Sequence, residues 1–223
     1  MKTKNKVWIV LLLVSFFGFS QTIESINRPL LDSLVEVAPF SEDLAAVRKG
    51  NQWGFIDKTG KLVIDFRNDI VWEQHSGRNQ DVGATVHYPR FQDGLCIIQE
   101  LKEDGIPFYG FMDRTGKIAI KPEFLNVTEF HEGRAVGIYC KKTFVGKNKF
   151  QLNIYDYSFT EVILNTQGEM IWPIGDRENI LMTRKRYKTP EIRTKLLSKE
   201  VIVVKNDKGY WELRKIDSTI NKE

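Results

Sequence analysis

The sequence is poor in the residue types that supply cross-links and nucleophiles. Its 223 residues include two cysteines, Cys96 and Cys140, and three histidines. Two cysteines cannot form a disulfide framework, although a single bridge between them is open to an exported chain. Each lies in a strand-like run, and the spacing places them on opposite faces of their strands, which favours free thiols. With 42% hydrophobic residues, a chain of this length can bury a core without such a bridge.

Motifs that announce catalysis or cofactor binding are also missing. His75, His87 and His131 lie in no recognised catalytic motif, and the chain has no Gly-x-Ser-x-Gly nucleophile. No histidine or cysteine pair has the short spacing of a metal site, and no glycine loop opens a helix where a phosphate could bind. We therefore expect no catalytic activity, no metal and no cofactor. Paired carboxylates for glycoside cleavage leave no local signature, so a weakly carbohydrate-active protein stays an alternative.

Long hydrophobic runs are absent as well. The apolar run at residues 7–19 follows three lysines and is shorter than the roughly 20 residues that a membrane-spanning helix needs. Small residues at 18 and 20 then precede Gln21, which is the layout of a secretory signal peptide and its cleavage site. We expect residues 1–20 to be removed, the mature chain to be periplasmic or extracellular, and no integral membrane anchor.

The chain after this leader has no large excess of positive or negative charge. The formal net charge of the whole chain is +4, and the three lysines of the leader account for most of it. The remainder is polarised, with a net charge of about −5 over residues 21–140 and about +6 over residues 141–223. A basic face of this kind could meet anionic glycans or lipid head groups, but a solvated surface is the simpler interpretation. An exported protein has little access to nucleic acid, so we expect no nucleic-acid partner.

What the sequence does contain is an internal repeat. Residues 55–64 reappear as residues 111–120 and, more faintly, as residues 163–171. A second element, Phe-x-x-Gly-Leu or a close variant, precedes each copy in the same order, at residues 40–47, 91–98 and 130–136. Three paired matches in one order indicate a tandem array of structural units.

Each copy reads as strands joined by tight turns. The run after the Trp-Gly pair of the first copy is rich in aromatic and β-branched residues and stops at an Asp-Lys-Thr-Gly turn signal, which predicts a β-hairpin. Asp57 can accept hydrogen bonds from the backbone two residues on, and Gly60 tolerates the left-handed conformation. Asp113 and Gly116 repeat this pair, so we interpret both aspartates as turn formers rather than catalytic acids. With the strand after the Phe-x-x-Gly element, each copy becomes a three-stranded meander.

The first copy, WGFID from Trp53 and Gly54 to Asp57, resembles the WG β-repeat found in many bacterial proteins. The second copy has Tyr109 in place of tryptophan, keeps Gly110, and continues into the Ile-Lys-Pro-Glu-Phe run that usually follows in this family. The third copy departs from the pattern, with glutamate and valine at the Trp and Gly positions. The resemblance implies a repeat-built β protein, often exported, whose repeats have no established catalytic activity.

The repeat also predicts the architecture, because a unit of this size cannot bury both faces of its own sheet and neighbouring units must stack. We predict an all-β fold of tandem three-stranded meander repeats in an open array or propeller-like arc. The expected order is a signal peptide (1–20), a lead-in (21–39), WG-type repeats within 40–171 (40–64, 91–124, 130–171), a degenerate fourth repeat (172–217) and a disordered tail (218–223).

The segment between the first two copies, residues 65–90, is much longer than the linker after the second, residues 121–129. Insertions between regular repeats are usually loops on one face, where binding specificity tends to lie. A lengthened strand pair or a local ornament explains the length equally well. The candidate binding residues in this loop are Trp72, His75, Arg78 and Tyr88.

Two further patterns have competing explanations. The basic residues within 141–149, 184–188 and 193–195 could bind a polyanion, but an exposed hairpin tip produces the same string, and we favour the tip. Trp53 and Tyr109 could stack sugars, but packing between repeats also requires regular recurrence, and we favour the core. We expect an exported binding or scaffold module whose partner is a protein or glycan of the cell envelope or exterior. A glycan-binding protein is the alternative.

Overall fold

The computed structural model describes residues 27–72, 88–102 and 105–216. These residues form strands and no helix, which confirms the all-β prediction. All of the strands belong to the compact unit of residues 33–223. The predicted signal peptide and the predicted tail lie outside the described residues. The strands are β1 (Glu36–Ser41), β2 (Leu44–Lys49), β3 (Gln52–Asp57), β4 (Leu62–Arg67), β5 (Leu95–Leu101), β6 (Pro107–Asp113), β7 (Ile118–Val127), β8 (Arg134–Lys147), β9 (Asn153–Asn165), β10 (Met170–Pro173), β11 (Glu178–Asn179), β12 (Thr194–Leu196), β13 (Val201–Lys205) and β14 (Trp211–Lys215).

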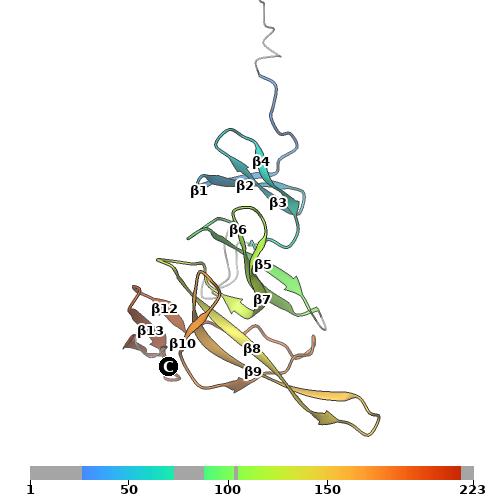
Figure 1. The fold of residues 1–223 in the computed structure, drawn as a ribbon, viewed down its shortest axis with the longest axis vertical. Helices are drawn as coiled ribbons and strands as arrows, with labels where there is room; N and C mark the ends of the chain where they lie inside the picture. The colour runs from blue at the N-terminus through green and yellow to red at the C-terminus, as the bar shows by residue number, and fades with distance from the viewer. Residues whose placement is uncertain (1–26, 73–87, 103–104, 217–223) are drawn as a thin grey trace, which may run out of the picture. The chain divides into compact units, whose positions relative to one another are not determined.

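The strands form three antiparallel sheets (Figure 1). The first has the order β1-β2-β3-β4, the second β10-β9-β8-β7-β6-β5 with β11 added beside β9, and the third β12-β13-β14. No sheet closes on itself in the described part of the chain, so the array is open. The β5 edge of the second sheet is bridged by the segment after β4, where Ile70 pairs with Ile98 and the Val71 N–H donates to the carbonyl oxygen of Ile97 at 3.2 Å.

The three predicted copies correspond to β2–β4, β5–β7 and β8–β10, each with three strands. Two boundaries differ from the prediction. The strand β1 begins at Glu36, before the predicted repeat start at residue 40, and adds a fourth strand to the first sheet. The second and third copies are not separate meanders, because the predicted linker at 121–129 lies mostly in β7, where Phe124 pairs with Tyr109 of β6 and also with Tyr139 of β8.

The structure confirms that Asp57 and Asp113 form turns by binding the backbone. The Oδ1 atom of Asp57 accepts hydrogen bonds from the backbone N–H groups of Thr59 at 2.8 Å and Lys61 at 3.1 Å. Asp113 does the same in the second copy at the same two distances. Gly60 and Gly116 close the turns with φ angles of 81° and 82°, where a side chain would be strained.

Acid should weaken these two turns. The hydrogen bond from the neighbouring threonine hydroxyl lowers the pKa of both Asp57 and Asp113 below the ordinary value of 3.8. A lowered pKa in the folded state means that the stabilisation is present above this ordinary value and is lost as the pH falls through the folded-state pKa. We expect the Asp57→Asn, Asp113→Asn double variant to lose less thermal stability between pH 6 and pH 3 than the unaltered chain.

Asparagine suits this test because Asn165 already occupies the same turn position in the third copy. Its Oδ1 accepts from the backbone N–H groups of Gln167 and Glu169 at 3.0 and 2.9 Å, without titrating. The measurement is the thermal midpoint followed by circular dichroism at both pH values. An equal loss in both proteins would show that other carboxylates carry the acid sensitivity.

A second set of turns connects the copies to one another. Each Phe-x-x-Gly element makes a two-residue turn with positive φ at both central positions, as type I′ hairpins require. The Glu42 carboxylate of the first copy accepts a hydrogen bond from the backbone N–H of Gly94 in the second, at 2.9 Å. Asp93 of the second copy does the same for Gly133 of the third, at 2.7 Å. The turns therefore form a ladder that sets the spacing between copies.

Aromatic packing follows the same rule from copy to copy. The phenylalanine after each Trp-Gly or Tyr-Gly pair meets the phenylalanine that opens the next copy, edge to face. Phe55 lies 4.8 Å from Phe91, and Phe111 lies 4.8 Å from Phe130, measured between ring centroids. All four rings are fully buried, so each contact joins two neighbouring units through the core.

The hydrophobic core accordingly lies between copies rather than within them. Neighbouring residues of β5 and β6 alternate between two separate cores, which buries the middle copy on both faces. One core receives Cys96, Ile98 and Met112, and the next receives Leu95, Ile97 and Phe111. A third core joins the third copy to the C-terminal sheet through Val136, Ile163, Ile202, Val204 and Ile216. Stacking of neighbours therefore completes each core, as the repeat predicts.

The third copy is attached to the C-terminal sheet by a polar substitution. Glu161, at the position that holds Trp53 in the first copy, accepts hydrogen bonds from the backbone N–H of Arg193 and the hydroxyl of Thr194, both at 2.5 Å. Burial raises the pKa of Glu161, and these two donors oppose the rise. The tryptophan of the predicted fourth copy, Trp211, is half-exposed on β14, so this sheet lacks the buried aromatic of the first copy.

Candidate functional site

The Trp-Gly pair serves packing. Trp53 is fully buried, and Tyr109 is half-buried against the second core, with its pKa raised by burial. This favours the core interpretation of both rings over a sugar-stacking strip. A Cβ atom on Gly54 would lie 2.8 Å from the carbonyl oxygen of Ile64, and on Gly110 it would lie 2.4 Å from that of Ile120. In each of the first two copies the third strand passes directly over the glycine, which explains why glycine stands there.

The long loop after the first copy is only partly described, and His75 and Arg78 lie outside the described residues. Trp72 packs edge to face on Trp53, with ring centroids 5.6 Å apart, and the Arg48 guanidinium lies 4.8 Å from the Trp72 ring centroid. Tyr88 packs against the same core. Both aromatic residues therefore contribute to packing, and a binding role for this loop stays a prediction.

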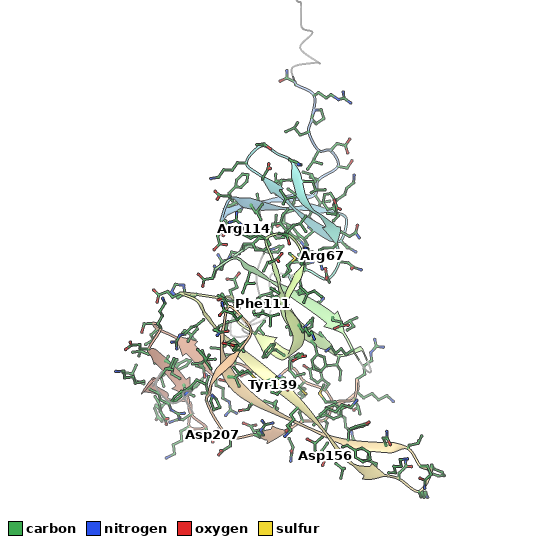
Figure 2. All side chains as sticks on the ribbon, viewed as in Figure 1. Arg67, Phe111, Arg114, Tyr139, Asp156 and Asp207 are labelled. Atoms are coloured by element: carbon green, nitrogen blue, oxygen red, sulfur yellow. The ribbon has the colours of Figure 1, made fainter. Side chains whose placement is uncertain are left out.

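A different part of the surface combines aromatic rings with charge. A cavity of about 250 Å³ lies where the β8–β9 hairpin leaves the rest of its sheet. We call it the aromatic hollow. Figure 2 marks one lining residue, Tyr139, and also Asp156, farther out on the hairpin. The lining residues are Lys102, Phe108, Glu123, Tyr139, Cys140, Lys142, Tyr157 and Met182.

Register explains how residues far apart in the sequence meet in the hollow. Lys142 of β8 pairs directly with Tyr157 of β9, so their side chains share one face of the hairpin. Cys140, two residues before Lys142, is on the same face. Phe108 comes from β6 and Glu123 from β7, so two strands of the second copy and the hairpin build the hollow.

The charges of the hollow lie against its rings. The Lys102 ammonium nitrogen is 4.9 Å from the ring centroid of Phe108. The Lys142 nitrogen is 4.3 Å from the centroid of Tyr155 and 5.7 Å from that of Tyr157. These are cation–π distances. Glu123 supplies the single carboxylate, which leaves a hollow with aromatic walls and a net positive charge.

The thiol of the hollow is not an activated nucleophile. Burial raises the pKa of Cys140 to about 11, and the nearby charge of Lys102 only partly offsets this. Because the thiolate is the reactive form, a thiol with this pKa is protonated at neutral pH. Cys96 is fully buried in the first core, and burial raises its pKa too. Both cysteines are free, so the possible bridge between them is not formed.

A second, larger cavity of about 520 Å³ lies between β9 and the C-terminal sheet. It is lined by charged residues of both signs, and several are already paired within it. Arg193 contacts Asp207 at 2.9 Å, and Arg214 contacts Glu212 at 2.8 Å. No group of three metal-ligating side chains occurs among the residues that the structure describes. Both ion pairs of this cavity therefore lie within the C-terminal part of the chain.

The sequence did not predict the residues of the aromatic hollow as a binding site. Phe108, Tyr139 and Tyr157 look like ordinary alternating strand residues, and nothing in their spacing sets them apart. One signal was present, because the basic run within 141–149 was predicted to be an exposed hairpin tip, and the structure confirms a hairpin there. The pairing of β8 with β7, which brings the hairpin beside residues of β6 and β7, could not be read from the run itself.

With this geometry in view, the comparison with known families is informative. The family described as WG containing repeat matches residues 35–53, 53–67 and 109–136. The chain carries WG repeats. The matched WG repeats cover β1 to β4 and continue from β6 into the start of β8.

Most of the third copy, from residue 137 on, and the C-terminal sheet lie beyond the matched WG repeats, consistent with their loss of the Trp-Gly pair. No curated protein and no solved structure matches the chain. The described residues contain no helix that is long and apolar enough to cross a membrane.

Proposed function

We propose that this chain is an exported, non-catalytic binding module whose ligand site is the aromatic hollow. The observation that carries the proposal is the gathering of three aromatic rings and two lysines around one cavity. Export rests on the signal-peptide layout of residues 1–20. Absence of catalysis rests on the missing sequence motifs and on the protonated state of the Cys140 thiol.

The chemistry of the hollow favours a glycan with an acidic group among the envelope ligands. The C–H face of a sugar ring is apolar and packs on the negative face of an aromatic ring. Lys102 and Lys142 offer a positive charge to a carboxylate or phosphate substituent, and Glu123 can accept hydrogen bonds from hydroxyl groups. The cavity is slightly smaller than the roughly 300 Å³ at the lower end of drug-sized ligand sites, which suits about one sugar ring.

Replacing Tyr157 by alanine should weaken glycan binding by at least about tenfold, because the ring forms part of the hollow and its loss removes a central contact. The protein would be residues 21–223, which contain the whole compact unit of residues 33–223. Binding would be screened on a panel of neutral and acidic envelope glycans, and the best ligand measured by calorimetry.

The matched control is Tyr210→Ala. Tyr210 is 70% exposed in the turn between β13 and β14 and lies outside the hollow. Equal binding by both variants would remove the hollow as the site. Turnover of any bound glycan that disappears in Glu123→Gln would contradict the non-catalytic part of the proposal and favour the weakly carbohydrate-active alternative.

A further inference from the structure

The outer half of the β8–β9 hairpin projects beyond its sheet (Figure 1). β8 pairs with β7 only as far as Tyr139, and β9 pairs with β11 only from Ser158 inward. Beyond these points the two strands pair with each other as far as Lys147 and Asn153. We call residues 144–154 the hairpin tip. The fold of the repeats does not need it, because the cores end nearer the base.

The hairpin tip exposes an unusual amount of apolar surface. Phe150 and Leu152 are 69% and 63% exposed, and Phe144, Val145 and Ile154 are exposed too. Single exposed apolar residues are ordinary, but a contiguous exposed group marks an interaction surface. These side chains cover none of the three cores, so packing within the chain does not explain them.

The apolar side chains surround the tip instead of lining one face. Phe144 pairs with Tyr155, which puts both rings on one face of the hairpin. Ile154 is the next residue along β9 and therefore points to the opposite face. Phe150 and Leu152 lie in the turn at the end. A flat protein surface can cover one face of such a hairpin, whereas the interfacial region of a lipid bilayer can surround the whole tip.

The charge of the same segment selects the kind of bilayer. Lys141, Lys142, Lys147 and Lys149 lie on the projecting part of the hairpin, against one carboxylate, Asp156. The Lys149 nitrogen is 5.1 Å from the ring centroid of Phe150, so the charge lies directly beside the exposed ring. Lysines placed in this way can keep their charge at the head groups while apolar neighbours enter. Each lysine near an anionic surface adds roughly fivefold to the affinity.

We propose that the hairpin tip inserts into the head-group region of an anionic phospholipid surface and so holds the protein at a membrane peripherally. This goes beyond the proposed ligand site, which uses Lys142, Tyr157 and residues of other strands. The tip and the hollow are separate groups of side chains, and each can be altered without the other. Edge pairing with a second copy is opposed by the lysines and by the bulge between Phe144 and Gly146.

The test is sedimentation of residues 21–223 with vesicles of phosphatidylcholine alone or mixed with phosphatidylglycerol. Phe150→Ser with Leu152→Ser should lower the partition coefficient on the anionic vesicles by at least about tenfold, since two large apolar groups leave the interface. Lys147→Glu with Lys149→Glu should lower it at least as much, with a smaller effect at high salt. Circular dichroism would check that both variants remain folded.

The matched control is Leu197→Ser with Leu213→Ser, two residues that are 57% and 71% exposed on the C-terminal part. This pair should leave vesicle binding unchanged. A Phe150→Trp variant should show a blue-shifted emission on anionic vesicles and quenching by brominated lipid.

Three outcomes would overturn the proposal. The first is no binding of the unaltered chain to anionic vesicles. The second is full binding by the Phe150→Ser, Leu152→Ser variant, which would indicate an electrostatic polyanion surface instead. The third is an equal loss in the control pair. Because glycan binding by the hollow is measured without vesicles, failure here leaves the proposed function standing, and failure there leaves the membrane result unaffected.

Discussion

Alanine in place of Gly110 should lower the free energy of unfolding by about 3 kcal/mol or more, which is the upper range for overpacking a buried site. The added Cβ atom would lie 2.4 Å from the carbonyl oxygen of Ile120 and 2.7 Å from backbone atoms of Lys121 and Pro122. All three neighbours are backbone atoms, so no side-chain rotation can relieve the contact. The strand β7 would have to move away from β6.

The irregular pairing of β6 with β7 shows why the approach is so close. Between the pairs Tyr109–Phe124 and Phe111–Ile120, β6 advances by two residues and β7 by four. The extra residues of β7 bend over Gly110 before the strand turns to pair with β8. Displacing this bend should therefore disturb the second and third copies together.

Urea unfolding followed by tryptophan fluorescence would measure the effect, together with a thermal midpoint that should fall by roughly 6–12 °C. Gly175→Ala is the matched control, because nothing lies within 4 Å of its added Cβ atom. Gly54→Ala should be intermediate, since its closest contact is 2.8 Å. Stability of Gly110→Ala within about 0.5 kcal/mol of the unaltered chain would mean that β7 shifts without cost.

Much of the fold follows from short sequence signals with local causes. The Asp57 and Asp113 turns need only a carboxylate, a threonine and a glycine in fixed order, and the structure contains both. The offsets between copies predict stacked units, and the shared cores confirm this. These features are predictable because each depends on neighbours in the sequence or on exact recurrence.

The remaining features depend on pairing between distant segments. The sequence of β7 does not reveal that Phe124 pairs on both sides, because alternation of apolar residues is the same in an edge strand and a shared one. The third copy is longer than the others, and its basic run predicts a hairpin without predicting which strands flank its base. The aromatic hollow forms at that base, so its residues could not be grouped from the sequence.

The predicted binding loop also shows that the role of a residue can depend on distant segments. Trp72 and Tyr88 are aromatic residues in an insertion, which makes a binding surface a reasonable prediction. However, the neighbouring Trp53 is fully buried and lies at the edge of the first core. That edge would be exposed to solvent without a covering side chain. Trp72 supplies that cover with Arg48 stacked upon it. Whether an inserted aromatic binds or covers depends on the core beside it, and the insertion alone does not reveal this.

Phe111→Ala should be among the most destabilising single changes, costing about 3–5 kcal/mol, as for other large aromatic residues removed from a core. The ring is 1% exposed in the second core and meets Phe130 of the next copy at 4.8 Å. Its loss leaves a cavity between two copies, and neither copy can close it without moving the other. Chemical denaturation would measure the change, with the exposed Phe150→Ala as the control, expected within about 0.5 kcal/mol of the unaltered chain.

A double-mutant cycle would then test whether the copies are coupled through this contact. If Phe111 and Phe130 form one unit, the effects of Phe111→Ala and Phe130→Ala should be non-additive, with a coupling energy of about 0.5–1.5 kcal/mol. Simple addition would mean that each ring stabilises only its own copy. Since the Phe55–Phe91 pair has the same geometry one step earlier in the array, an equal coupling there would make this edge-to-face contact the interaction by which one WG repeat stabilises the next.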